Sequence, residues 1–245
     1  MTKLQTLPYE ILNSLQFYLG ENEVLDEVFP ESIDTQWIHE IIEYNDDIEN
    51  PEKVLKLSIN TKSVNLKNFT NLTILHCYGN KLTKLPSGLT NLTILFCSHN
   101  QLTSLPDNLT INGVLDCRYN QLTSLPDNLT VNGSLFCNHN KLTSLPDNLI
   151  VKRSLWCTNN RLTSLPDNLT VNGSLNCRYN QLTSLPDNLT VNGYLSCKDN
   201  KLTSLPDNLT VNGTLYCKDN PIAKKSDEEL LKGGAYIEGN IDREW

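Results

Sequence analysis

The chain has 245 residues, eight cysteines and a formal net charge of −8 at pH 7. No apolar run reaches the ~18 residues that a membrane-spanning helix needs. The first ten residues lack the basic flank and the apolar stretch of a secretory signal. The sequence therefore favours an intracellular, cytoplasmic protein.

The acidic charge is concentrated at the amino-terminal end. Residues 1–50 hold twelve acidic side chains and one basic side chain, Lys3, so they carry −11 and leave the remainder at +3. Apolar residues recur with helical periodicity over 7–19 and 36–44. We expect residues 1–50 to form a small helical module that caps the fold.

The opening of this module has a second interpretation. The segment LPYEIL at 7–12, followed by Leu15, Tyr18 and Leu19, resembles the first helix of an F-box, the motif that docks on the adaptor of SCF-type ubiquitin ligases. The second half of an F-box carries a Val-Cys-x-x-Trp-like helix, whereas this chain has Trp37-Ile38-His39 in a different spacing. An F-box would make that adaptor a partner, and an ordinary cap would not.

A period of twenty residues dominates the rest of the sequence. From 71 to 222 the copies follow the unit QLTSLPDNLTVNGSLFCNHN, written here for 121–140. The cysteines recur with this period, at 77, 97, 117, 137, 157, 177, 197 and 217, so they mark a repeat and not a disulfide framework. Residues 51–70 look like an atypical capping repeat, with Leu55, Leu57 and Asn60 in register with Leu75, Cys77 and Asn80.

Each copy contains one predicted strand. Because strand side chains alternate between faces, Leu135 and Cys137 should point inward while Ser134, Phe136 and Asn138 point into water. Asn140 follows the strand, where its amide can pair with backbone groups of neighbouring turns. The proline in the LTSLPDNL segment excludes a helix and predicts extended or polyproline-like backbone on the return path.

The L-x-C-x-x-N-x-L strand and the LTSLPDNL segment resemble the shortest leucine-rich repeats. They are similar to those of bacterial type III effectors, and most of all to the Asn- and Cys-rich repeat proteins of mimivirus-like giant viruses. The resemblance spans residues 55–222 and implies a leucine-rich-repeat solenoid with a parallel sheet on its concave face. One departure is Asn132 and its equivalents, which stand three residues before the strand leucine where an apolar residue is usual; we expect Val131 and its equivalents to supply the apolar contact instead.

Residues 223–245 are predicted to close the far end. The segment SDEELLK begins with a capping box, Ser226 and Glu229, which predicts a short helix, and Gly233-Gly234 ends it. This helix can cover the last open turn.

The copies differ from one another mainly on the outward positions of the predicted strand. Exposed aromatic and arginine side chains are the usual hot spots of protein interfaces, and Trp156 is the first candidate. Its copy also carries Lys152-Arg153 where other late copies have Asn-Gly. The predicted partner-binding residues are Phe96, Asp116, Arg118, Tyr119, Phe136, His139, Lys152, Arg153, Trp156, Arg178, Tyr179, Tyr194, Lys198 and Tyr216.

No motif in the sequence indicates catalysis, a cofactor or a metal site. The cysteines lack the paired C-x-x-C spacing of zinc sites, although crosslinks between neighbouring turns remain open on distance alone. The leading interpretation is a non-enzymatic protein-interaction module. The alternatives are a substrate receptor of an SCF-type ligase and a single-stranded nucleic-acid binder, which would use Arg118, Tyr119, Arg178, Tyr179, Lys198 and Lys218 against the opposing charge of Asp116, Asp199 and Asp219.

Overall fold

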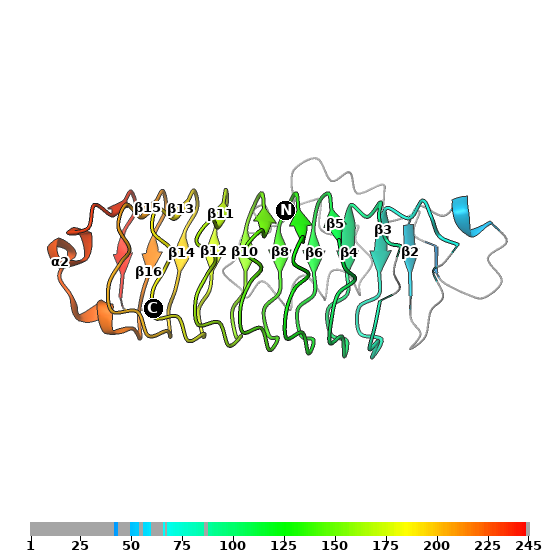
Figure 1. The fold of residues 1–245 in the computed structure, drawn as a ribbon, viewed down its shortest axis with the longest axis horizontal. Helices are drawn as coiled ribbons and strands as arrows, with labels where there is room; N and C mark the ends of the chain where they lie inside the picture. Colours follow the sequence, from blue (N-terminus) through cyan, green and yellow to red (C-terminus); the bar gives the residue numbers. More distant parts are fainter. Residues whose placement is uncertain are drawn as a thin grey trace, which may run out of the picture.

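The computed structural model describes residues 42–43, 50–53, 56–59, 66, 68–85 and 88–243. Within these residues the chain is a parallel β-solenoid, in which successive turns stack along one long axis (Figure 1). The predicted helix at 7–19 and the F-box-like motif lie outside the described residues. The second predicted helix, 36–44, is wrong where it can be checked, because Ile42–Glu43 is strand β1 and pairs in parallel with β2.

The main sheet has eleven parallel strands in the order β1-β2-β3-β4-β6-β8-β10-β12-β14-β16-β18. Equivalent residues of successive turns pair directly, as Leu135 does with Leu155. This sheet corresponds to the predicted strand ladder. Its members after β1 are β2 (Lys56–Ser58), β3 (Ile74–His76), β4 (Ile94–Phe96), β6 (Leu115–Asp116), β8 (Leu135–Phe136), β10 (Leu155–Trp156), β12 (Leu175–Asn176), β14 (Leu195–Ser196), β16 (Leu215–Tyr216) and β18 (Ile241–Asp242).

A second sheet, which the sequence did not predict, lies on the return path. Its seven parallel strands have the order β17-β15-β13-β11-β9-β7-β5. The predicted extended backbone precedes these strands, with a turn in which the Leu129 amide donates to the Pro126 carbonyl at 3.0 Å. The strands are β5 (Thr110–Ile111), β7 (Thr130–Val131), β9 (Ile150–Val151), β11 (Thr170–Val171), β13 (Thr190–Val191), β15 (Thr210–Val211) and β17 (Tyr236–Ile237).

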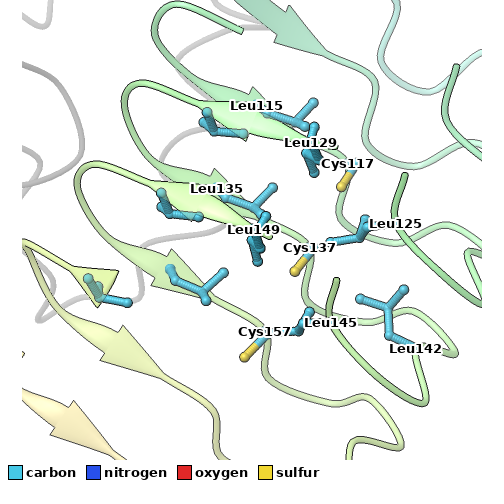
Figure 2. Packing of buried hydrophobic residues seen from close by; sticks show 14 of the residues in the cluster. Leu115, Cys117, Leu125, Leu129, Leu135, Cys137, Leu142, Leu145, Leu149 and Cys157 are labelled. Carbon is cyan, nitrogen blue, oxygen red and sulfur yellow. The ribbon is translucent and has the colours of Figure 1, made fainter. Parts of the chain in front are cut away.

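The core lies between the two sheets and runs the length of the solenoid. Leu135 and Cys137 are fully buried, as are their equivalents in the neighbouring turns. Figure 2 shows Leu115 and Leu135 at equivalent places in successive turns, with Cys117, Cys137 and Cys157 in a row beside them. Val131 is also fully buried, which confirms that it supplies the apolar packing that Asn132 does not provide. Each turn therefore fills the core with the same few side chains.

A ladder of buried asparagines joins the turns where the main-sheet strands end. The Asn180 side-chain oxygen accepts from the Leu162 amide at 3.0 Å, and its nitrogen donates to the carbonyls of Cys157 and Cys177, both at 3.0 Å. The same pattern recurs from Asn100 to Asn220. One amide thus satisfies backbone groups of two adjacent turns, which confirms the structural role predicted for this position.

The two ends differ from the internal turns. At the amino-terminal end, Leu57 and not Leu55 pairs with Leu75, so the predicted register was wrong by two residues. A shift of two preserves the inward alternation, and buried Ile59 then follows Leu57 as Cys77 follows Leu75.

At the carboxyl-terminal end the predicted capping box is confirmed. Ser226 and Glu229 cap helix α2 (Asp227–Leu231), and Leu230 is buried against the last turn. Beyond α2 the chain continues into β17 and β18, which extend both sheets by one more strand.

Replacing a ladder asparagine should destabilise the array far more than replacing a surface one. Asn180→Ala leaves buried backbone groups of two turns without their partners, and we expect the free energy of unfolding to fall by about 2–4 kcal/mol. Urea unfolding followed by circular dichroism measures this loss. Asn172→Ala, an exposed position in the same turn, is the matched control and should change stability by less than about 0.5 kcal/mol.

The buried thiols should make the fold sensitive to alkali. Burial raises the pKa of Cys77 and of Cys157 to about 12 and raises that of the other cysteines as well. The folded state therefore keeps its thiol protons at pH values where the unfolded chain has lost them. Stability should be intact below about pH 8.5 and fall above it, by about 1.4 kcal/mol per pH unit for each thiol still buried.

This dependence can be measured as the slope of unfolding free energy against pH between 9 and 11. A Cys117→Ala/Cys137→Ala variant supplies the control, because it should show a shallower slope by about two protons. Identical slopes for the two proteins would contradict the thiol origin of the effect.

Candidate partner-binding face

The main sheet places twelve of the fourteen predicted site residues on one side. They lie on its strands or within three residues of a strand end, with the core leucines and cysteines pointing the other way. We call this side the outer face. It carries Phe96, Asp116, Arg118, Tyr119, Phe136, His139, Trp156, Arg178, Tyr179, Tyr194, Lys198 and Tyr216.

Lys152 and Arg153 do not join them. Both are exposed and follow β9 of the second sheet, where their amides donate to the carbonyls of Val131 and Gly133 at 3.1 Å. They occupy the turn between the two sheets. The structure therefore does not bring them together with the other twelve residues.

A compact aromatic cluster occupies the middle of the outer face. The rings of Phe136 and Trp156 meet edge to face with centroids 5.7 Å apart, Val114 packs with them, and Phe96 and Tyr194 lie against their flanks. This is a second hydrophobic cluster, separate from the core between the sheets.

The prediction that these rings stand in water is wrong. Phe136 is 4% exposed and Trp156 9% exposed. Part of the cause is visible within the face itself: adjacent parallel strands are only about 4.8 Å apart, so large side chains in equivalent positions shield one another. Copy-to-copy variation at these positions is therefore not free drift in solvent.

Asp116 and Arg118, also predicted to be exposed, form a buried ion pair beside this cluster. The Arg118 Nε donates to Asp116 Oδ1 at 2.8 Å and its second terminal nitrogen to Oδ2 at 2.9 Å. Ser98 Oγ donates to the same carboxylate at 3.0 Å, and the guanidinium lies over the Phe136 ring, 5.2 Å from its centroid. Both charges are thus neutralised within the protein.

A column of stacked rings runs along the edge of the outer face. His99 and Tyr119 stack with centroids 4.3 Å apart, Tyr119 and His139 stack at 4.1 Å, and Tyr78 meets His99 edge-on. His99, Tyr119 and His139 have φ values of 52°, 51° and 55°, a left-handed conformation uncommon for residues other than glycine and asparagine. Burial lowers the pKa of His99 and of His139, so the stack favours neutral imidazoles.

The carboxyl-terminal part of the face is more polar. The Lys198 ammonium lies 4.9 Å from the centre of the Tyr216 ring, whose neighbour Tyr194 meets it edge-on, and the Arg178 guanidinium lies 6.0 Å from the ring of Tyr179. Burial lowers the pKa of Lys198. Tyr179 is 50% exposed, which makes it the most accessible ring of the predicted set.

Three residues that the sequence analysis did not select have unsatisfied polar atoms on the same face as the aromatic cluster. Ser134 Oγ, Asn138 Oδ1 and Asn176 Oδ1 are shut off from water and have no hydrogen-bond partner, and the same is true of Arg178 Nε. A buried polar atom without a partner costs about 1–3 kcal/mol. Only the packing reveals these atoms, because the sequence places serine and asparagine at many surface positions of the repeat.

Clusters of metal-ligating side chains and long apolar helices are both absent from the residues that the structure describes. Among them no three His, Cys, Asp or Glu side chains converge as a metal site would require. Nor does any helix in this part of the chain have the length and apolarity to cross a membrane.

Residues 70–110 match the family model described as Leucine Rich repeats (2 copies). The architecture is a leucine-rich-repeat solenoid. No curated protein sequence matches the chain.

Several solved structures are similar to this solenoid. The leucine-rich effector protein YopM from Yersinia pestis is 26% identical with a TM-score of 0.43, and the match covers 62% of this chain and 50% of that one. YopM from Yersinia enterocolitica is 27% identical with a TM-score of 0.43, covering 67% and 40% of the two chains. A leucine-rich-repeat protein from Leptospira interrogans is 20% identical with a TM-score of 0.41, covering 76% and 78%. This chain thus spans half or less of the YopM proteins.

Breaking the buried ion pair should destabilise the outer face. Asp116→Asn removes the bidentate carboxylate of Arg118 and leaves the guanidinium charge in a buried site, so we expect the free energy of unfolding to fall by about 3 kcal/mol. Asp219→Asn, an exposed carboxylate at the same face, should change it by less than about 0.5 kcal/mol. Equal losses in the two variants, measured by urea unfolding, would contradict this account.

Proposed function

We propose that the chain is a non-enzymatic module that binds a protein partner on the outer face of the main sheet. The observation that carries the proposal is the aromatic cluster of Phe136 and Trp156 on the same face as the unsatisfied atoms of Ser134, Asn138 and Asn176. Aromatic anchors beside unpaired hydrogen-bonding groups are what a protein partner uses, because it supplies apolar surface and backbone donors together. A solenoid alone would not support this function, since one fold hosts many ligands.

The charge on the outer face favours a protein over a nucleic acid. Arg118 is neutralised by Asp116. Lys198 and Lys218 are each followed directly by a carboxylate, Asp199 and Asp219. Binding to single strands depends on a continuous cationic track for the phosphates, and the described face lacks one.

The proposal is tested by substitutions on opposite faces of the same turn. A partner captured with the full chain from its natural host is purified, and its affinity is measured by calorimetry for Trp156→Ala and for Ile150→Ala. Ile150 is 48% exposed on the second sheet, so it reports truncation of an exposed apolar side chain away from the face. We expect Trp156→Ala to weaken binding at least about thirtyfold, typical of an interface hot spot, and Ile150→Ala to leave it unchanged.

A second variant separates binding from folding, because Trp156 is buried and its truncation can disturb the face. Tyr179→Ala removes an accessible ring and should weaken binding about fivefold or more without lowering the unfolding midpoint. If neither Trp156→Ala nor Tyr179→Ala alters the affinity, the partner binds elsewhere and the proposal fails.

A further inference from the structure

Several copies of the repeat place an asparagine directly before a glycine in the turn that leads from the second sheet to the main sheet. Asn132-Gly133, for example, stands between β7 and β8. Asparagine is a thermolabile residue, and a following glycine makes it more so, because no Cβ hinders attack of the glycine nitrogen on the side-chain amide. The asparagines of these pairs are Asn112, Asn132, Asn172, Asn192 and Asn212. All are exposed except Asn132, which is half-buried.

The packing between turns requires these glycines. A Cβ on Gly113 would lie 2.8 Å from the Thr93 carbonyl oxygen, and a Cβ on Gly213 would lie 2.8 Å from the Gly193 carbonyl oxygen. Both separations are too short for a real Cβ, so only glycine permits the backbones of adjacent turns to approach this closely. The stacking of the solenoid therefore preserves a reactive pair in these copies.

The glycine N–H groups of the five pairs differ in their hydrogen bonds. Gly193 N donates to the Gly173 carbonyl at 3.0 Å, and Gly173 N donates to the Arg153 carbonyl at 3.2 Å. The other three glycines make no such bond with any residue that the structure describes: Gly113, Gly133 and Gly213. A bonded N–H must be released before its nitrogen can attack, so the pairs at Asn172 and Asn192 should react more slowly.

The side-chain oxygens of the asparagines differ as well. Asn132 Nδ2 donates to Asn112 Oδ1 at 3.1 Å, and Asn212 Nδ2 donates to Asn192 Oδ1 at 3.2 Å. A donor at this oxygen stabilises the negative charge that develops there when the carbonyl carbon is attacked. Asn112 therefore combines both favourable features, a donor on its amide oxygen and a following N–H that is not engaged within the described part of the chain.

We propose that this row of turns is a site of spontaneous deamidation and that Asn112 is its fastest-reacting residue. The Gly113 nitrogen forms a bond to Asn112 Cγ, and its proton passes through water to the side-chain nitrogen. That nitrogen leaves as ammonia when its bond to Cγ breaks. One water molecule then opens the succinimide ring to aspartate or isoaspartate. Each event adds one negative charge, and water is the only co-reactant.

The copy with Lys152-Arg153 interrupts the row. It has neither the amide nor the glycine, so it is inert in this reaction. Its Arg153 carbonyl accepts the hydrogen bond of Gly173, which makes Asn172-Gly173 the first protected pair. Residues 122–135 and 162–175 have the same sequence, yet only the second segment has a bonded glycine N–H. Selectivity along the repeat thus comes from hydrogen bonds between turns, and it does not depend on partner binding at the outer face.

Mass spectrometry of the full chain, aged in mildly alkaline buffer made with oxygen-18 water, tests the proposal. Each deamidation retains one oxygen from water, and trypsin separates the five pairs into five different peptides. We expect Asn112 to react about fivefold faster than Asn192, which has the same donor on its amide oxygen but a bonded glycine N–H. Asn172, which has neither favourable feature, should react most slowly.

The same measurement on the chain unfolded in urea separates structure from local sequence. The difference between Asn112 and Asn192 should disappear there, because the hydrogen bonds between turns are lost. Equal rates in the folded protein would overturn the proposal, and so would a difference of the same size in urea.

A pair of substitutions tests the donor at the amide oxygen. Asn132→Ala should slow Asn112 about threefold and leave Asn192 unchanged. Asn212→Ala is the matched control, since it should slow Asn192 by a similar factor and leave Asn112 unchanged. Circular dichroism checks that both variants keep the fold. If Asn112 reacts at its original rate in folded Asn132→Ala, the ranking of Asn112 as the fastest site loses its cause and the proposal fails.

Discussion

The whole molecule depends on the in-register stacking of turns that are twenty residues long. Each internal turn buries a leucine and a cysteine beneath the main sheet and an aliphatic residue beneath the second sheet, and it has no core of its own. A single turn orders too much backbone for the apolar area that it buries, so it is stable only between neighbours. The ladder asparagine enforces the register, because its amide reaches backbone groups of two adjacent turns at hydrogen-bond distance.

The sequence predicted the inside of this structure well, because the inside is repetitive. Leucine, cysteine and asparagine recur at fixed positions, and a strand has only two faces, so the residues that fill the core follow from the period alone. Where the period weakens, the prediction weakened with it. At residues 51–70 a shift of two residues preserves the inward pattern, and only the pairing of Leu57 with Leu75 distinguishes the two registers.

The outside could not be predicted in the same way, because it is decided by contacts between different copies. In the sequence Asp116 and Arg118 look like surface charges. In the structure they form an ion pair within one turn, and the Arg118 guanidinium lies against the Phe136 ring of the next turn. Phe136 and Trp156 look like solvent-facing rings until their strands are placed side by side. The second sheet was missed because its strands follow the proline-containing segment, for which extended backbone was predicted without any pairing between turns.

The stacked column of His99, Tyr119 and His139 shows what strict repetition permits. Because equivalent residues of successive turns are related by one nearly constant translation, any ring placed at this position adds to a stack without changing the backbone. Gain or loss of a complete turn would therefore lengthen or shorten the distance between the aromatic cluster and the lysines by one strand spacing, about 4.8 Å, while both ends of the array keep their own contacts. The distance between contact points on this solenoid can therefore change in steps of one turn. Duplication or loss of turns can diversify that distance as readily as substitution of side chains diversifies the contacts themselves.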